Sequence, residues 1–551
     1  MPSMAIPADA LRPSGANPLA ELPAELLAKI PERAIDYSRV ESGRDARRDA
    51  TLVADAIVVG SGAGGAVAAA ILAEGGLDVL VLEEGALHRT EDFSTDVLAS
   101  MRALYRDAGT SMILGTPGII FAEGRCVGGS TVINGAMYWR TPERILERWE
   151  REEQIPDIGP RAMEPFFAEV EREVNPEVNR RDTFGLHNEL FERAATRLGW
   201  HPRPNLRNMR RCAGLNNCAF GCPTGAKQST LVTYVPRALR AGARVHADAG
   251  VDRVLFDNWR ATGVRGRFVG TNGRPTYRFS AHAPLVVLAA GARHTIGILK
   301  RSWLRARTIG RNLTTHPNAK VVGVFAEPIY AWRGTHQAHQ IHDFLEQGIL
   351  IGYAMIPPGL LAASLPGLGV RTAELMALYD HMFPAACLIE DSGTGRVTLG
   401  PDREPQMWYS LNREDTRTCH EGVAKATELM FAAGANKVLL PFDDLMEVSS
   451  PDEIRRIRER PLSPRGIELM TVHIMGTARM AGDRSRGATD AFGRVFDVPG
   501  LVVADASLFP GPVGVNPQET IMALAARNTH RWLESDVRDL VSKRRAPRAS
   551  T

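Results

Sequence analysis

Apolar residues form short continuous runs at four places in the chain, and each run is typical of a buried parallel strand. Residues 54–60 (ADAIVVG) and 78–83 (DVLVLE) flank the small residues 63–73, which predict a helix packed closely on the first strand. This order of strand, helix and strand predicts a βαβ unit. Two later runs, 284–290 (PLVVLAA) and 501–504 (LVVA), are of the same all-apolar type.

The wide separation of these runs predicts an α/β fold with a Rossmann-like domain built from discontinuous segments and an inserted α+β domain for substrate. We expect the nucleotide-binding domain at 51–135, 226–320 and 471–551, and the inserted domain at 136–225 and 321–470. Residues 1–50 read as an N-terminal arm with one short amphipathic helix at 24–33. A chain of 551 residues is long for one core, which favours two connected domains.

One stretch, 349–370 (ILIGYAMIPPGLLAASLPGLGV), carries no charge and is long enough to cross a bilayer. Pro357, Pro358 and Pro366 interrupt it, and each proline inside a helix costs about 3 kcal/mol and removes a hydrogen-bond donor. A membrane-spanning helix is therefore not expected. The stretch fits a buried strand, a lid, or a surface that touches lipid.

Composition and charge narrow the function classes. The residues are 44% hydrophobic and 23% charged, and the formal charge of +3 comes without a basic stripe, so no nucleic-acid partner is expected. Six cysteines in so long a chain do not form a disulfide scaffold. The N-terminal residues lack the features of a secretory signal. We expect a cytoplasmic protein, with peripheral membrane contact possible.

A glycine motif follows the first apolar strand. Gly60, Gly62 and Gly65 match G-x-G-x-x-G at the start of the small-residue helix. Gly60 permits the tight turn, Gly62 lets backbone amides approach a pyrophosphate, and Gly65 lets the helix lie close to the strand. Glu83, at the end of the second strand, is placed to bind ribose hydroxyls. The motif predicts a dinucleotide, and FAD and NAD both satisfy it.

From about residue 54 to 530 the chain resembles the glucose–methanol–choline (GMC) oxidoreductases. Four blocks carry the resemblance, and they favour FAD over NAD. They are the glycine motif through Glu83; 124–135 (GRCVGGSTVING); 310–317 (GRNLTTHP) after the strand ending at Ala290; and the C-terminal words 473–480 (HIMGTARM), 503–507 (VADAS) and 514–517 (GVNP).

The resemblance implies the residues that contact FAD. Gly128 and Gly129 give the 124–135 loop the freedom to approach the flavin. Pro517 opens an apolar helix, 518–526, whose N-terminus would stabilise negative charge on the reduced flavin. Residues 130–134 contain no histidine, so FAD is expected to bind non-covalently. Further cofactor contacts are assigned to Asn134, Val251, Ala290, Asp505 and Ala506.

Alcohol oxidation needs a base for the hydroxyl proton and an acceptor for the hydride. Flavin N5 supplies the acceptor, and a neutral histidine suits the base. His473 lies in the block where family members carry the catalytic histidine, and Asn516 matches its partner position. The asparagine amide would orient the hydroxyl and stabilise the developing alkoxide.

Three cysteines crowd into one segment: Cys212, Cys218 and Cys222, the last followed by Pro223. In spacing and trailing proline the segment is similar to the iron–sulfur sugar dehydrogenases of this superfamily, whose three cysteines hold a [3Fe-4S] cluster. In the words 220–230 (FGCPTGAKQST) it looks more like the long-chain alcohol oxidases. Three structural thiols, or a redox disulfide between two of them, are the alternatives.

The expected activity is oxidation of a hydrophobic long-chain or cyclic alcohol to an aldehyde or ketone, because the uncharged 349–370 stretch offers an apolar wall. Two alternatives stay open. One is a sugar or polyol dehydrogenase that passes electrons through the cluster to a cytochrome or quinone. The other is a non-catalytic flavoprotein that binds lipid. Oxygen is the acceptor expected if no cluster is present.

Overall fold

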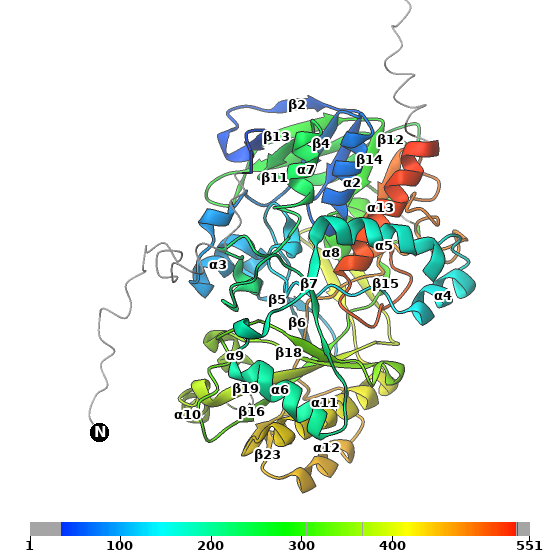
Figure 1. Ribbon diagram of the computed structural model, residues 1–551. Helices are drawn as coiled ribbons and strands as arrows, with labels where there is room; N and C mark the ends of the chain where they lie inside the picture. Colours follow the sequence, from blue (N-terminus) through cyan, green and yellow to red (C-terminus); the bar gives the residue numbers. More distant parts are fainter. Residues whose placement is uncertain (1–34, 305, 366, 368, 536, 538–551) are drawn as a thin grey trace, which may run out of the picture.

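The computed structural model describes residues 35–304, 306–365, 367, 369–535 and 537. The helix predicted at 24–33 lies outside the described residues. Figure 1 shows two layered parts, one above the other, joined by several crossings of the chain. The upper part holds the glycine-motif strand and helix, and the lower part holds a large sheet backed by helices.

The upper part is built on a six-stranded sheet in which every neighbouring pair is parallel. Its strands, in spatial order, are β1 (Val40–Ser42), β10 (Arg244–Ala247), β4 (Val79–Leu82), β3 (Ala56–Val59), β14 (Leu285–Leu288) and β25 (Leu501–Val503). All four predicted apolar strands are therefore confirmed, and they lie side by side. Strand β1 comes from the segment expected to be an arm, and it pairs with β10.

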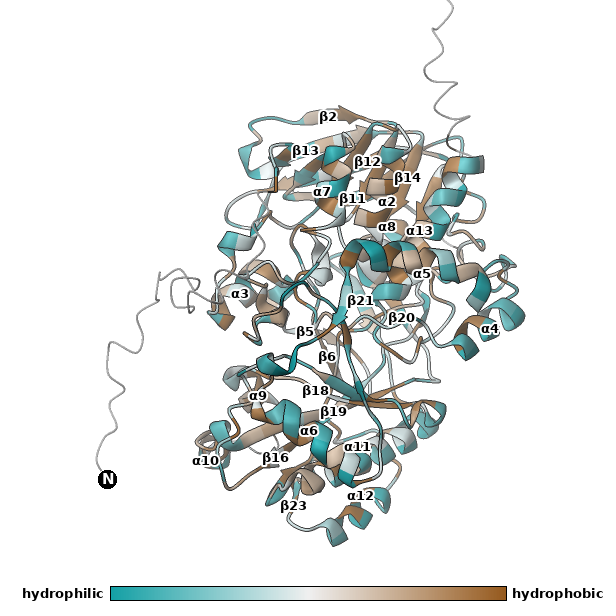
Figure 2. Cartoon of the chain, in the orientation of Figure 1, coloured by the Kyte–Doolittle hydropathy of each residue, from teal (hydrophilic) through white to brown (hydrophobic). Residues whose placement is uncertain are grey.

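Helix α2 (Ala63–Glu74) lies against the centre of this sheet, as predicted. Ten of its twelve residues are buried, and Figure 2 shows hydrophobic colours along α2 and β14. The close packing depends on glycine: a Cβ on Gly64 would lie 1.5 Å from Ala504 O, and one on Gly65 would lie 2.0 Å from Gly60 O. The βαβ unit is confirmed with the geometry that its glycines predict.

Other helices complete the upper part. Helix α13 (Gln518–Ser535) packs on α2 and on α5 (Pro160–Val174), and α7 (Tyr234–Arg240) packs on the other side of α2. A second sheet contacts the parallel sheet through β11 and β12; its strands are β11 (Ala249–Asp257), β12 (Arg260–Val269), β13 (Pro275–His282) and β2 (Ala50–Val53). Helix α8 (Gly291–Arg301) follows β14.

The lower part is built on a ten-stranded sheet. Its strands are β5 (Ser111–Ile113), β6 (Ile119–Phe121), β24 (Leu469–Thr471), β16 (Asn318–Val324), β19 (Met382–Ile389), β18 (Ile349–Tyr353), β17 (His339–Ile341), β8 (Pro202–Pro204), β22 (Lys437–Leu439) and β23 (Glu447–Val448). Strands β5 and β6 come from the segment assigned to nucleotide binding, so the chain crosses between the parts earlier than residue 135. Helices α6 (Leu186–Arg197) and α11 (Arg413–Ala433) pack on this sheet.

Smaller elements complete the two parts. They are α3 (Val97–Leu104), α4 (Glu143–Glu152), α9 (Pro358–Ser364), α10 (Val370–Met376), α12 (Arg455–Arg458), and the strands β7 (Pro176–Val178), β9 (Leu206–Asn208), β15 (Arg311–Leu313), β20 (Gly395–Leu399) and β21 (Pro405–Trp408). The surface helix α4 is predominantly hydrophilic in Figure 2.

The uncharged stretch 349–370 divides into three pieces. Strand β18 is buried along its whole length, and α9 and the start of α10 follow it. The prediction of a buried strand is confirmed for the first five residues. Within the described residues no helix has the length and apolar character needed to cross a membrane. The cytoplasmic location and the peripheral membrane contact stay predictions.

Candidate active site

A cavity of about 800 Å³ is lined by residues of both parts of the molecule. It contains twelve of the fourteen residues predicted to bind the cofactor or to act on substrate. These are Gly60, Gly62, Glu83, Gly129, Asn134, Val251, Ala290, His473, Asp505, Ala506, Asn516 and Pro517. The other two, Gly65 and Gly128, lie behind the lining and shape the backbone. One cavity therefore collects residues that are up to 457 positions apart in the chain.

The glycine turn opens onto this cavity. Gly60 has φ +100°, a left-handed conformation that favours glycine. A Cβ on Gly62, by contrast, would meet no atom within 4 Å, so the space above it is free. This open space lies at the N-terminus of α2, where backbone amides and the helix dipole attract an anion. The arrangement fits a pyrophosphate.

Glu83 holds the turn in place. Its Oε2 accepts hydrogen bonds from Ser61 N at 2.9 Å and Ser61 Oγ at 2.7 Å, and its Oε1 accepts from Gly85 N at 2.9 Å. Burial raises the pKa of this carboxyl, against the lowering effect of those donors. The ribose contact predicted for Glu83 stays a prediction, and its observed partners belong to the protein.

The 124–135 loop docks directly on the glycine turn. Gly128 N donates to Ser61 Oγ at 2.9 Å, and a Cβ on Gly129 would lie 3.0 Å from Gly62 Cα. At its far end, Asn134 Nδ2 donates to Oε1 of Gln518, the first residue of α13. The loop thus links the N-termini of α2 and α13 across the floor of the cavity.

Asp505 fixes the start of α8. Its Oδ2 accepts from Gly291 N at 2.9 Å and from Thr295 Oγ1 at 2.5 Å, and its Oδ1 accepts from Ser507 N at 2.8 Å. Burial raises its pKa in spite of these donors. The Asp505 side chain lines the cavity. Its predicted role in cofactor binding therefore includes holding the N-terminus of α8 toward the cavity.

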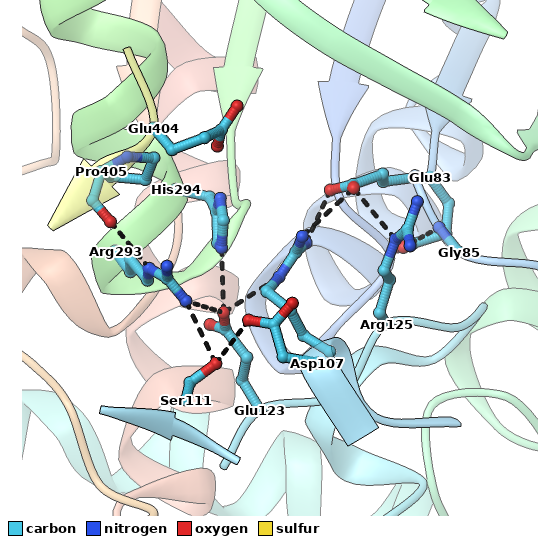
Figure 3. Close-up of polar contacts among 12 residues, drawn as sticks. Glu83, Gly85, Asp107, Ser111, Glu123, Arg125, Arg293, His294, Glu404 and Pro405 are labelled. Carbon is cyan, nitrogen blue, oxygen red and sulfur yellow. Dashed lines mark hydrogen bonds and ion pairs between the residues drawn. The ribbon is translucent and has the colours of Figure 1, made fainter. Parts of the chain in front are cut away.

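A buried charge cluster borders the cavity where α8 meets the segment before the 124–135 loop (Figure 3). Glu123 accepts from Arg293 Nη1 at 3.1 Å, contacts His294 Nε2 at 2.9 Å and pairs with Arg106 Nε at 3.0 Å. Burial alone would raise the pKa of Glu123, but His294, Arg106 and Arg293 lower it to about 2. Arg106 also pairs with Glu84 at 2.6 Å. The cluster ties strands and helix together beside the cofactor space.

His473 lies on the chain just after β24, and it is 9% exposed at the cavity wall. Its backbone N donates to Thr471 Oγ1 at 3.0 Å. Its Nδ1 lies 3.4 Å from His316 Nδ1, with the two rings at 85°. Because Gly514 N donates to His316 Nε2 at 3.1 Å, the His316 proton lies on the Nδ1 that faces His473.

Both imidazoles are kept neutral. Burial lowers the pKa of His473 to about 4. Burial, followed by the neighbouring His473, lowers the pKa of His316 well below its ordinary value. A neutral ring is the form that can accept a proton, which is what a base requires.

Asn516 lines the cavity at the entry to α13. Gln340 Nε2 donates to Asn516 Oδ1 at 3.0 Å, and Gln340 Oε1 contacts His342 Nε2 at 3.2 Å. This contact fixes which end of the Asn516 amide is the carbonyl. Its NH₂ group is then the end available for a substrate oxygen.

The three predicted cluster ligands do not form a metal site. Among the described residues no three His, Cys, Asp or Glu side chains gather closely enough to hold a metal ion. Cys212, Cys218 and Cys222 line a separate cavity of about 20 Å³, which has room for a water molecule. The iron–sulfur cluster stays a prediction that the described geometry does not support.

Several residues of the site were not among the predicted ones, although His316 and Ser61 lie inside motif blocks. Gln340 and His316 contact the predicted pair, and Ser61 joins the two glycine-rich segments. Thr230 Oγ1 lies within hydrogen-bond distance of Ser61 O and Gly128 O, both at 3.1 Å. Thr230 belongs to the 220–230 segment, which resembles the long-chain alcohol oxidases. The signal that points to Thr230 is its small hydroxyl side chain within the 220–230 segment.

The fold and the site together define a flavin-type dinucleotide-binding oxidoreductase. Family models support and sharpen this class: residues 55–96 match an FAD binding domain, residues 101–318 match the first GMC oxidoreductase model, and residues 391–525 match the second. The chain belongs to the GMC oxidoreductase family. It is an FAD-dependent enzyme acting on CH–OH groups.

Individual relatives agree. An uncharacterised GMC-type oxidoreductase of Sinorhizobium fredii is 33% identical over 89% of this chain and 96% of its own. A long-chain-alcohol oxidase of Arabidopsis thaliana is 30% identical over 86% of this chain and 66% of its own. The solved structure of a formate oxidase mutant from Aspergillus oryzae has a TM-score of 0.66 at 16% identity and covers 90% of this chain and all of its own; it supports the fold.

Proposed function

We propose that this enzyme oxidises a hydrophobic long-chain or cyclic alcohol to the aldehyde or ketone. The observation that carries the proposal is the wall of the cavity beyond His473 and Asn516. That wall is formed mainly by apolar side chains: Leu350, Met355, Ile356, Leu360, Leu388, Met470 and Ile474. A sugar needs many fixed polar partners, whereas an alkyl or cyclic skeleton needs apolar contact.

The sheet register shows how the wall extends away from the catalytic pair. Asn318 pairs with Met470 on one side and with Leu388 on the other, and Leu388 pairs with Leu350. Two residues further along, the row contains Ala386 and Gly352 opposite Lys320. These rows are about 7 Å apart, and the small residues of the second row leave space for a chain to lie along the sheet.

The far end of this wall closes against α9. Lys320 Nζ donates to Ser364 O at 2.8 Å and pairs with Glu468. Beyond them, Leu361, Leu365 and Leu375 pack on Val322 and Met382. An elongated substrate that enters the cavity therefore meets mainly apolar side chains, with the paired Lys320 and Glu468 among them, before it reaches α9.

The protein groups supply binding and proton transfer. FAD, held by the α2 turn and the 124–135 loop, supplies a hydride acceptor at flavin N5. The Asn516 NH₂ group donates to the hydroxyl oxygen and orients it. His473, whose ring is neutral, accepts the hydroxyl proton. The apolar wall excludes water, which strengthens both interactions.

We further propose that FAD is bound non-covalently, because the 130–134 stretch offers no histidine, and that oxygen is the first acceptor to test. The long-chain-alcohol oxidase relative supports that choice. A sugar or polyol dehydrogenase that reduces a cytochrome or quinone is the alternative outcome. It is less well supported, because the thiols do not form a metal site.

Anaerobic mixing with 1-decanol is expected to bleach the oxidised-flavin absorption, and glucose at the same concentration is not. The apolar wall gives decanol a binding energy of about 0.8 kcal/mol for each buried methylene, which glucose lacks. Readmitted air should restore the flavin colour and yield hydrogen peroxide. Bleaching by glucose alone would overturn the substrate proposal, and reoxidation only by a cytochrome would overturn the choice of acceptor.

Leu360→Asp places a carboxylate on the α9 wall and is expected to raise KM for decanol by at least about tenfold, because burying an unpaired charge costs several kcal/mol. Val370→Asp is the matched control, since Val370 is 75% exposed on α10 and does not line the cavity. Steady-state kinetics over a series of alcohol lengths measures both. Equal KM values for the two variants would remove α9 from the substrate site.

The pH dependence of flavin reduction is set by His473. Because burial lowers its pKa to about 4, the neutral form predominates at every pH above that value. Reduction should therefore be constant from neutral pH downward and fall as the pH drops through about 4, where the ring gains a proton. Stopped-flow reduction by decanol across this range is the measurement. Half-loss near 6.5, the ordinary value for histidine, would contradict the prediction.

A further inference from the structure

Two buried cations lie beside the three thiols of the 212–222 segment. Arg207 is 0% exposed and Lys227 is 2% exposed. Within the described residues neither one has a carboxylate partner at ion-pair distance. Burial lowers the pKa of Lys227 to about 8, against the opposing effect of Cys218 and Cys222. A buried cation without a counter-charge is costly, and the neighbouring sulfurs are groups beside these two cations that can carry a negative charge.

Cys218 is the sulfur best placed to carry that charge. Arg207 Nη2 donates to Cys218 Sγ at 3.0 Å, which is short for a sulfur acceptor and sets a guanidinium charge directly against this sulfur. Cys212 packs on the small cluster of Ala136, Met209 and Cys218. Burial raises the pKa of Cys212 to about 11, so this second thiol keeps its proton.

The same two cations hold the 124–135 loop. Lys227 Nζ donates to Val132 O at 2.6 Å, to Asn134 O at 2.9 Å and to Cys218 O at 2.7 Å. Arg207 Nη2 donates to Gly135 O at 2.8 Å. The thiols are thus connected, through one layer of side chains, to the backbone that borders the cofactor space.

The cavity beside the thiols admits a small oxidant. Its volume of about 20 Å³ exceeds the roughly 10–15 Å³ that one water needs, and a hydroperoxide is only slightly larger than water. Cys212 and Cys222 are partly exposed, which gives a route from solvent. The site therefore suits peroxide chemistry at sulfur.

We propose that Cys218 and Cys212 form a redox-active dithiol that hydrogen peroxide oxidises to a disulfide, and that this change repositions the 124–135 loop. The Cys218 thiolate attacks one peroxide oxygen, the O–O bond breaks, and the released hydroxide takes a proton to become water. Cys212 sulfur then attacks the sulfenic acid; its proton leaves with the hydroxyl as a second water. The two sulfurs lose two electrons, and the peroxide gains them.

Disulfide formation removes the negative charge from Cys218. Arg207 and Lys227 then stay buried without a counter-charge, and their contacts with 132–135 shift. Flavin reduction slows as a result. The inference does not depend on which alcohol is the substrate; if oxygen is the acceptor, as proposed above, the enzyme's own product is the oxidant and the dithiol limits turnover as peroxide accumulates.

The test uses the FAD-loaded enzyme, reduced with dithiothreitol, desalted and then titrated with hydrogen peroxide. Differential alkylation and peptide mass spectrometry should find a Cys212–Cys218 disulfide. Flavin reduction should slow by about tenfold, since small misplacements in an active site have effects of this size, and dithiothreitol should restore it. The flavin absorption band should shift and recover in parallel.

Cys212→Ser and Cys218→Ser both remove the disulfide, and each is expected to abolish the reversible loss of activity. Cys212 is half-buried, so Cys212→Ser still tests the dithiol if Cys218→Ser does not fold. Cys419→Ala, a buried thiol on α11, is the control and should keep the full peroxide response. An unchanged rate with the disulfide formed, no disulfide at all, or stoichiometric iron in the purified enzyme would each overturn the proposal. Thiol labelling detects the presence or absence of the disulfide even if decanol is not a substrate.

Discussion

His473→Ala should leave a folded, FAD-loaded protein that reduces its flavin at least about 100-fold more slowly, because a positioned acid–base group contributes roughly 10²–10⁴ in rate. The alanine removes the ring that accepts the hydroxyl proton and leaves the apolar wall and Asn516 in place. The loss should therefore appear in kcat, with KM for decanol little changed. Anaerobic stopped-flow reduction separates this step from reoxidation.

Two comparisons make that result specific. His201→Ala changes a histidine whose side chain is 85% exposed and should reduce its flavin at the normal rate. The flavin content and the thermal unfolding of His473→Ala should match the parent enzyme, which shows that the cavity left by the ring does not disturb FAD. A loss smaller than about tenfold would remove His473 from the catalytic role.

The sequence predicted the parallel sheet because its strands are recognisable one at a time. Each of β3, β4 and β14 is a run of apolar residues that are all buried, and such runs occur where both faces of a sheet are covered. The ten-stranded sheet was not predictable in this way. Its strands β5, β6 and β24 have three residues each, and short segments from distant parts of the chain show no periodicity.

The candidate site also contains residues that local motifs predict and residues whose roles depend on contacts between distant segments. Gly62, Asn134 and Asp505 were placed by motifs that fix local backbone, and all three line the cavity. Gln340 was missed, and His316 was given no role within its 310–317 block, because both roles arise only when another element folds against them. The cysteine spacing left several roles open for a related reason: spacing does not say which groups surround the sulfurs, and the fold brings the buried Arg207 and Lys227 beside them.

Gly62→Val is expected to give a folded protein that has lost FAD. A Cβ on Gly62 meets no protein atom within 4 Å, and the backbone φ of −70° suits any residue. The valine side chain therefore costs the fold little and fills the space where the pyrophosphate would approach the α2 amides. Each charge-assisted hydrogen bond lost in this way costs about 1.5–3 kcal/mol, so FAD affinity should fall by at least tenfold. Flavin absorbance per protein after gel filtration, and titration of the apoprotein with FAD, measure this loss.

Two other glycines separate this effect from a general loss of stability. Gly359→Val is the matched control, because a Cβ on Gly359 also meets nothing within 4 Å but points to solvent from α9; this variant should keep its FAD. Gly64→Val should fail differently, since its Cβ would lie 1.5 Å from Ala504 O and would force α2 off the sheet, lowering the unfolding temperature of the apoprotein. If Gly62→Val retained FAD at the parent's affinity, the glycine turn would not be where the pyrophosphate binds.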